Sequence, residues 1–237
     1  MERFYKDVTT GPDLAGGYAV LLDGRPVRTP EKETLSAPNA ALAALIAAEW
    51  AAQDGAIKPD TMPLTQLLTT AIDRVKPNRD VITDQLLAYI DSDLLCYRAI
   101  TPEGMGDEQA KLWDPWLAWF TTRFGGTLAT TTDLIRLDQD KVIHETLRTH
   151  VDGLDLHQFT LLQVAASVCG SIVLGLAVCD GAISPEDGYA CALCEELFHE
   201  RIHDLERHGL DPVEEKRRNA IMDDLRACDT YRKALLA

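Results

Sequence analysis

The longest apolar stretch of the chain, Phe159 to Val178, limits its fold more than any other feature. These twenty residues, FTLLQVAASVCGSIVLGLAV, contain no charged side chain. A helix of this length can cross a bilayer, or it can lie at the centre of a protein with other elements on all sides. Polar residues recur along the run, and no cluster of Lys or Arg flanks it. We therefore predict one central core helix and no membrane span, with Gly170 and Gly175 admitting close helix neighbours.

The charge of the chain excludes several classes of partner. Its 237 residues carry 38 acidic and 23 basic side chains, for a net charge of −15. Nucleic acids and anionic lipid surfaces attract proteins with a basic face, so we expect neither as a partner. A hydrophobic fraction of 46% is ordinary for a folded globular protein. The composition thus predicts an acidic, soluble protein with a substantial core.

The N-terminus and the cysteines indicate a reducing compartment. The opening residues MERFYKDV carry charges where a signal peptide would be apolar. The six cysteines are concentrated in apolar helical segments, where Cys usually packs as a small hydrophobe. They are Cys96, Cys169, Cys179, Cys191, Cys194 and Cys228. We expect a cytoplasmic bacterial protein, or alternatively a mature protein of the mitochondrial matrix.

The first 62 residues predict a small α+β domain. Two extended runs, Tyr18–Leu22 and Arg25–Thr29, flank Asp23-Gly24, a pair that favours a tight hairpin turn. Asn39 can cap a helix over 40–53. We therefore expect a hairpin-containing sheet with one helix laid across it.

Residues 63–237 predict a mostly α-helical domain, which makes the whole chain an α+β protein. Pro77 is expected to end the first helix, and Pro115 to break or kink a later one. Ser184-Pro185 and Asp211-Pro212 mark the starts of the last two helices. The helices are expected over 63–76, 80–90, 108–124, 140–150, 159–178, 185–208 and 211–235.

His199 to His203 reads HERIH and matches the HExxH pattern of zinc hydrolases. On a helix the two histidines would project from one face and could bind zinc, with Glu200 as general base. A third ligand with a recognisable spacing is missing from the sequence. A zinc-dependent hydrolase is therefore the alternative function, against the interpretation of the segment as a solvated acidic helix face.

Two further groups favour core packing over chemistry. Cys191 and Cys194 form a CxxC pair that we place in the middle of the same helix as His203, where one metal ion could not reach all of them. Three tryptophans at 113, 116 and 119 lie at helical spacing and are expected in a core or domain seam. No phosphate-binding glycine motif occurs.

A series of short segments, in a fixed order from the N-terminus to the later helices, carries a family resemblance. They are RFYK from Arg3, LDGRPVRTP from Leu22, AAEWAAQ from Ala47, MPLTQLLTTAIDRV from Met62, SDLLCYRA from Ser92, Gln109 with WDPWLAW from Trp113, and GSIVLGLAV from Gly170. In their order and spacing, together with the final acidic helical pair, they resemble a known family of assembly chaperones, which hold the alpha subunit of the F-type ATP synthase.

This resemblance implies a binding protein with no catalytic activity and no cofactor. Its partner would be the free alpha subunit, which it would shield from aggregation until alpha joins beta; the chaperone itself would be a monomer when free. The resemblance implies a structural role for Trp50, which would fix the N-terminal helix to its sheet. It also places Glu200 where the family has an important acidic residue, as a contact for a cationic group of the partner. That residue precedes a Trp-Gly pair in the family and His208-Gly209 here.

Overall fold

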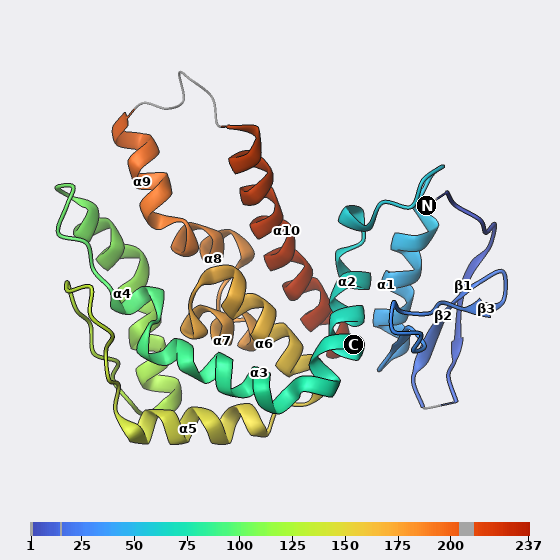
Figure 1. Cartoon of the computed structure of the whole chain (residues 1–237), viewed down its shortest axis with the longest axis horizontal. Coiled ribbons are helices and arrows are strands. Elements are labelled where there is room, and N and C mark those ends of the chain that lie inside the picture. Colours follow the sequence, from blue (N-terminus) through green and yellow to red (C-terminus); the bar gives the residue numbers. More distant parts are fainter. Residues whose placement is uncertain (1, 15, 204–210) are drawn as a thin grey trace.

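The computed structural model, which describes residues 2–14, 16–203 and 211–237, begins with a small antiparallel sheet (Figure 1). Its strands are β1 (Val8–Pro12), β2 (Tyr18–Leu22), β3 (Arg25–Pro26) and β4 (Ser36–Ala37). Strand β2 pairs with each of the other three. Asp23 and Gly24 have φ values of 47° and 77°, and Leu22 pairs with Arg25. The predicted tight hairpin is therefore confirmed.

Helix α1 (Ala40–Ala51) lies across this sheet, also as predicted. The Asn39 side chain accepts a 2.9 Å hydrogen bond from the N–H of Leu42 and so caps the helix. Leu42 and Ile46 are fully buried on its inner face. Asn39 also donates to the carbonyl of Ala234, which ties this unit to the end of the last helix. The domain boundary between 62 and 63 stays a prediction.

The chain then enters a helical path that is kinked at Asn78, directly after Pro77, where the first helix was expected to end. Helix α2 (Pro63–Thr69), a π-helical turn (Thr70–Val75) and α3 (Lys76–Ala88) follow one another directly. The backbone departs from helical angles only at Asn78, and the Asn78 side chain donates to the carbonyl of Arg74. A proline near a helix start loses no hydrogen bond, so the path bends here without stopping.

Helix α4 (Met105–Phe124) likewise runs through Pro115 without the expected break. Pro115 is exposed, so water can solvate the carbonyl that its missing N–H would have paired. Helix α5 (Lys141–Asp152) begins at Asp140, which caps it through a 2.8 Å bond from the N–H of Val142.

The apolar stretch Phe159–Val178 is not one helix, and this prediction was wrong. Helix α6 (Leu156–Cys169) ends at Gly170, and α7 (Ile172–Asp180) begins directly after Ser171. Gly170 adopts a left-handed φ of 65°, which closes the first helix, and the Ser171 hydroxyl caps the second through the N–H of Leu174. The two helices therefore fold back on each other as a hairpin.

Only Gly175 admits the close neighbour that was expected of both glycines. A Cβ at Gly175 would lie 2.9 Å from the backbone nitrogen and the Cβ of Ala166. A Cβ at Gly170 would meet nothing within 4 Å. Gly170 thus serves the turn, while Gly175 lets α6 and α7 approach closely.

Gly175→Ala should lower the free energy of unfolding by up to about 2 kcal/mol. Overpacking against the backbone of α6 costs about 1–3 kcal/mol, and the gain in helix propensity returns about 1 kcal/mol. Chemical denaturation measures the difference. The control is Gly188→Ala, in helix α8 (Pro185–Ala192), where a Cβ would make ordinary contact 3.6 Å from Leu225. That variant should be as stable as the parent or more so; equal losses at both sites would contradict the packing explanation.

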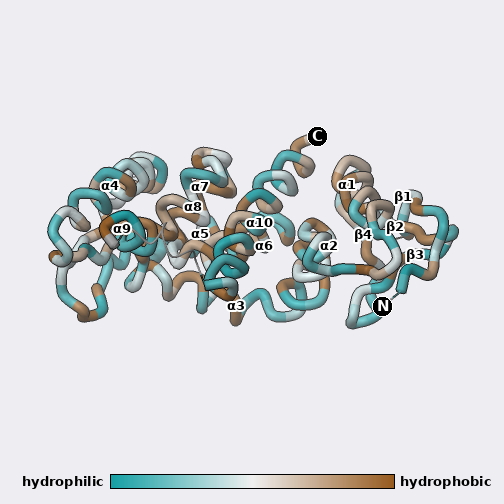
Figure 2. Tube along the Cα trace, turned by 90° about the horizontal axis from the view of Figure 1, so that it is seen from above, coloured by the Kyte–Doolittle hydropathy of each residue, from teal (hydrophilic) through white to brown (hydrophobic). Residues whose placement is uncertain are grey.

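The α6–α7 hairpin forms the centre of the core. Helices α3, α4, α8 (Pro185–Ala192) and α10 (Pro212–Leu235) pack around it. The residues from Ile172 to Val178 are all buried, and Figure 2 shows the body extended between the sheet at one end and α4 and α9 (Cys194–His203) at the other. Within the described residues, none of the helices combines the length and hydropathy needed to span a membrane.

Candidate partner-binding region

Helix α9 lies toward the end of the molecule opposite to the sheet, and the beginning of α10 lies beside it nearer the middle (Figure 1). Phe198 is buried and lies against Gly104 at the start of α4. Gln109, fully buried on α4, donates a 2.7 Å hydrogen bond to Glu195 and accepts one from the N–H of Ala99. These contacts fix the base of α9, which carries Glu200.

A cluster of five charged residues joins α9 to α10, and we call it the tip cluster. It consists of Glu196, Glu200, Glu214, Arg217 and Arg218. Arg218 lies 2.6 Å from Glu200 and 2.7 Å from Glu214, while Arg217 lies 2.7 Å from Glu214 and 3.3 Å from Glu196. Hydrogen bonds from Arg217 and Arg218 lower the pKa of Glu214 to about 2. Glu214 is therefore ionised at neutral pH and paired with both arginines.

The position of Glu200 differs from the interpretation of this segment as a solvated helix face. Its side chain is only 20% exposed, and that of Arg218 is 8% exposed. A carboxylate in this position holds α9 against α10 as well as facing the surface. A change of charge at Glu200 would leave Arg218 beside a second cation or a neutral group, so this site does not tolerate charge changes as a free surface position would.

The geometry gives the HExxH interpretation no support. Glu200, its would-be general base, is paired with Arg218, and His199 is exposed on α9. The side chain of His203 and the pair His208-Gly209 lie outside the described part of the chain. Within that part, no three His, Cys, Asp or Glu side chains are placed to hold a metal ion.

We expected the CxxC pair in the middle of one continuous helix, and this prediction was wrong. The path breaks at Leu193, so Cys191 belongs to α8 and Cys194 begins α9. Both residues are 2% exposed. Burial raises the pKa of the Cys191 thiol to about 12 and that of Cys194 to about 11, which keeps both protonated. Their burial supports core packing.

The tryptophans also lie in the core or beside it. Trp113 is fully buried, and its indole N–H donates a 2.9 Å hydrogen bond to the carbonyl of Cys191. Trp116 and Trp119 are partly buried and contact each other edge to face. Trp113 thus links α4 to α8 inside the helical part, in line with the predicted core position.

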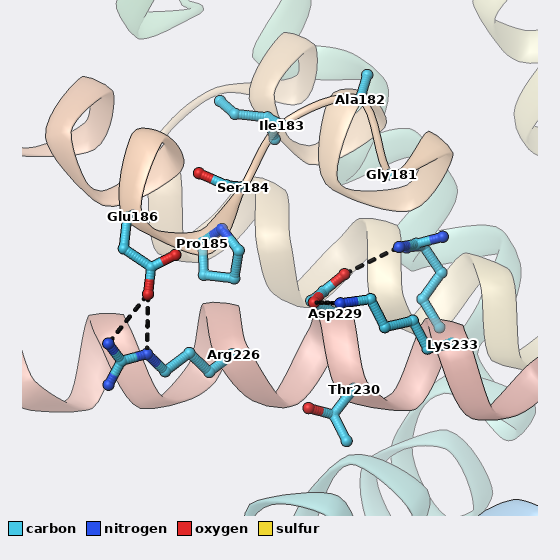
Figure 3. A pocket seen from close by; sticks show the side chains of 11 residues that line it. Gly181, Ala182, Ile183, Ser184, Pro185, Glu186, Arg226, Asp229, Thr230 and Lys233 are labelled. Carbon is cyan, nitrogen blue, oxygen red and sulfur yellow. Dashed lines mark hydrogen bonds and ion pairs between the residues drawn. The ribbon is translucent and has the colours of Figure 1, made fainter.

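Sequence reasoning missed a polar pocket between α10 and the turn Gly181–Glu186 (Figure 3). It has a volume of about 590 Å³. Glu186 pairs with Arg226 at 3.0 Å, and Asp229 with Lys233 at 2.6 Å. The helical spacing of charges on α10 is the only sequence signal for it. Because these charges are already paired, the pocket offers no spare acid or base for catalysis.

Trp50 lies at the end of α1, in the N-terminal unit. Its ring centroid is 5.9 Å from that of Tyr5, and the Tyr5 hydroxyl donates a 2.7 Å hydrogen bond to the Trp50 carbonyl. The indole N–H is covered by protein and has no acceptor among the described residues. The proposed structural role of Trp50 therefore depends on packing alone.

Trp50→Phe should lower the free energy of unfolding by about 1 kcal/mol, whereas Trp50→Ala should lower it by about 3 kcal/mol. Phenylalanine keeps an aromatic ring against Tyr5 and removes a buried donor that has no acceptor, while alanine removes the packing itself. Chemical denaturation of the two variants measures the contrast. If Trp50→Phe lost as much stability as Trp50→Ala, an aromatic ring at this position would not be enough. The contribution would then come from the indole group, including its N–H, and the packing explanation would be wrong.

Comparisons of the sequence and of the structure with known proteins both find similarity to ATP12 chaperones. Residues 2–121 match the model of the family described as ATP12 chaperone protein. Atp12 from Paracoccus denitrificans, also solved as an Asp-to-Lys variant, is 36% identical with a TM-score of 0.86; the match covers 98% of this chain and 97% of that one. The Atu1473 protein of Agrobacterium tumefaciens is 33% identical with a TM-score of 0.88, over 99% and 86% of the two chains.

A mitochondrial relative extends the comparison. Protein ATP12 of Saccharomyces cerevisiae is 33% identical over 113 residues, which cover 40% of this chain and 35% of the yeast protein. The chain thus spans about a third of that relative's length. The structural matches confirm the α+β class, with a sheet and helix followed by a mostly helical region. With the family match over half of its length, the chain belongs to the ATP12 chaperone protein family.

Proposed function

We propose that this protein is an assembly chaperone of the F-type ATP synthase. It binds the free alpha subunit and prevents its aggregation before alpha joins beta. The observation that carries the proposal is the match to Atp12 of P. denitrificans over 98% of the chain. A free subunit exposes apolar assembly surfaces, and a protein that covers them keeps the subunit soluble.

The proposed activity is binding without catalysis or a cofactor. The family description names a chaperone, and the charged groups of the tip cluster and of the α10 pocket are held in ion pairs. Such pairs can be exchanged for pairs with a partner, which favours specificity and fast association. We propose the tip cluster, including Glu200, as part of the surface that the alpha subunit contacts.

The state and location of the protein are proposed on the same basis. We expect a monomer when free, which a partner then converts into a one-to-one complex. The relatives come from bacteria and from a mitochondrion, so both the bacterial cytoplasm and the mitochondrial matrix are consistent with the proposal.

Co-expression with the cognate alpha subunit tests the function. The amount of alpha subunit in the soluble fraction should increase several-fold when the chaperone is present. Affinity purification should recover a complex of the two proteins. The proposal fails if alpha is equally insoluble with and without this protein and no complex is recovered.

Two further measurements separate the alternatives. An excess of an unrelated unfolded protein should not displace alpha; displacement would indicate a general holdase. Metal analysis of the purified full chain addresses the zinc hydrolase, because stoichiometric zinc that disappears on His199→Ala would favour that function over the chaperone.

A further inference from the structure

A cavity in the N-terminal unit has no role in the function proposed above. It has a volume of about 900 Å³, within the range of ligand-binding clefts. The N-terminal segment, the β2–β3 hairpin, the end of α1 and the loop after it form its walls. It lies at the sheet end of the molecule, opposite to α9 (Figure 1).

The inside of this cavity is apolar and aromatic. Tyr5, Leu22 and Val27 form buried parts of its lining, and Trp50 adds a partly buried ring. Phe4 stands edge-on to Tyr5, with centroids 5.4 Å apart, and is 67% exposed. An exposed aromatic ring beside an apolar cavity is a common feature of sites that receive a large side chain.

The walls of the cavity favour insertion of a side chain over extension of the sheet. The edge strand β3 consists of Arg25 and Pro26, and Pro30 and Pro59 also line the cavity. Proline has no N–H to offer to an added strand, so these walls are poor templates for strand pairing. They are also rigid, which lowers the entropy lost on binding.

The rim of the cavity carries two arginines that are available to a partner. Arg25 and Arg28 are exposed; Arg28 donates to the Thr34 hydroxyl, and neither forms an ion pair with any residue that the structure describes. The nearby carboxylate of Asp23 is fixed in the turn, because it accepts hydrogen bonds from the N–H groups of Lys6 and Asp7. The two arginines and the one carboxylate of Asp23 leave this rim with a net positive charge, in a chain of net charge −15.

We propose that this cavity binds an extended segment of a partner protein. The segment inserts one large apolar side chain between Phe4 and Trp50, and an acidic residue next to it pairs with Arg25 or Arg28. The charge of the rim selects an acidic segment, and the proline walls select insertion over strand addition. The site is separate from the tip cluster and does not depend on which ATP synthase subunit the protein binds.

Short peptides test this site on the full chain. The probes are acetylated five-residue peptides with a central Phe flanked by Asp, the same peptide flanked by Lys, and the Asp peptide with a central Ala. Backbone and indole amide NMR signals report where each peptide binds. We expect the Asp–Phe peptide to bind with a Kd of about 1 mM and to shift signals of residues 4–5, 22–30 and 50. The other two peptides should bind at least about tenfold more weakly.

Variants give the second arm of the test. Phe4→Ala and the double variant Arg25→Glu with Arg28→Glu change exposed side chains and should weaken the Asp–Phe peptide about tenfold. The matched control is Arg123→Glu with Arg148→Glu, the same charge change on the helical part, which should leave binding unchanged.

Three outcomes would overturn the proposal: equal binding of the Lys peptide, NMR shifts confined to the tip cluster, or no NMR shifts at all. Shifts of the cavity signals with protein concentration alone would overturn it in favour of a second copy of this chain. Because no alpha subunit is used, these outcomes leave the proposed function untouched.

Discussion

Asp93→Ala is expected to lower the free energy of unfolding by about 3–5 kcal/mol. The Asp93 side chain is fully buried at the junction of α6 and α7. Its Oδ1 accepts the N–H of Leu95 at 3.0 Å, and its Oδ2 accepts the Ser171 hydroxyl at 3.0 Å and the N–H of Val173 at 3.2 Å. Removing the carboxylate leaves these donors buried without an acceptor, and each such donor costs about 1–3 kcal/mol.

Urea denaturation followed by circular dichroism measures this loss. The matched control is Asp84→Ala, because Asp84 makes an exposed ion pair with Arg148 and its side chain is 70% exposed. That pair should contribute at most about 1 kcal/mol. If both variants lose the same small amount, Asp93 does not hold the α6–α7 junction.

Asp93 should also give the stability a pH dependence below neutrality. Burial raises the pKa of Asp93 to about 6, above its usual range, and the hydrogen bonds from Leu95, Ser171 and Val173 only partly oppose this. The folded state therefore holds the proton at a higher pH than the unfolded state does, so stability from this group falls as pH rises from about 4 to about 6. The difference in unfolding free energy between the parent and Asp93→Asn should decrease over that range. A difference that stays constant would show that Asp93 does not titrate there.

The local signals of the sequence were sufficient where the neighbours along the chain determine the structure. Asp23-Gly24 and Asn39 act within a few residues, and both the hairpin and the start of α1 were predicted correctly. The break inside 159–178 had a local signal as well, because Gly170-Ser171 combines a helix stop with a helix cap. The apolar residues on both sides of this pair led to the prediction of one continuous helix. The hydrogen bonds that hold this break are donated by Ser171 and Val173 to the carboxylate of Asp93, which lies 78 and 80 residues earlier in the chain.

Other features depend on contacts that no local pattern contains. The break at Leu193 has no glycine or proline to mark it. The pairing of Glu200 with Arg218 joins two helices, so the HExxH pattern suggested a free carboxylate where the fold places an ion pair. The cavity at Trp50 combines four segments of the N-terminal unit. For Glu200 and Trp50 the sequence identified the residue, and only the packing of distant elements determined its environment.

Glu200→Lys is expected to reduce recovery of the alpha subunit about tenfold and to lower the free energy of unfolding by about 2 kcal/mol. The new ammonium group would face Arg218, which is almost fully buried and would keep only Glu214 as a partner. Co-purification of alpha and chemical denaturation measure the two effects. The matched control is Glu196→Lys, one turn earlier on α9, where the pair with Arg217 is 41–45% exposed and should change stability by less than about 1 kcal/mol.

Neutral variants then decide how Glu200 acts. If its carboxylate contacts a cation of the partner directly, Arg218→Gln should preserve or strengthen binding, because it frees Glu200 for that contact. If Glu200 positions α9 through Arg218, both Glu200→Gln and Arg218→Gln should weaken binding to a similar extent. The 2.6 Å pair and the burial of Arg218 favour the second outcome. In that outcome Glu200 belongs to the proposed contact region as a positioning residue, and neighbouring groups of the two helices that it holds together would make the direct contacts with the partner.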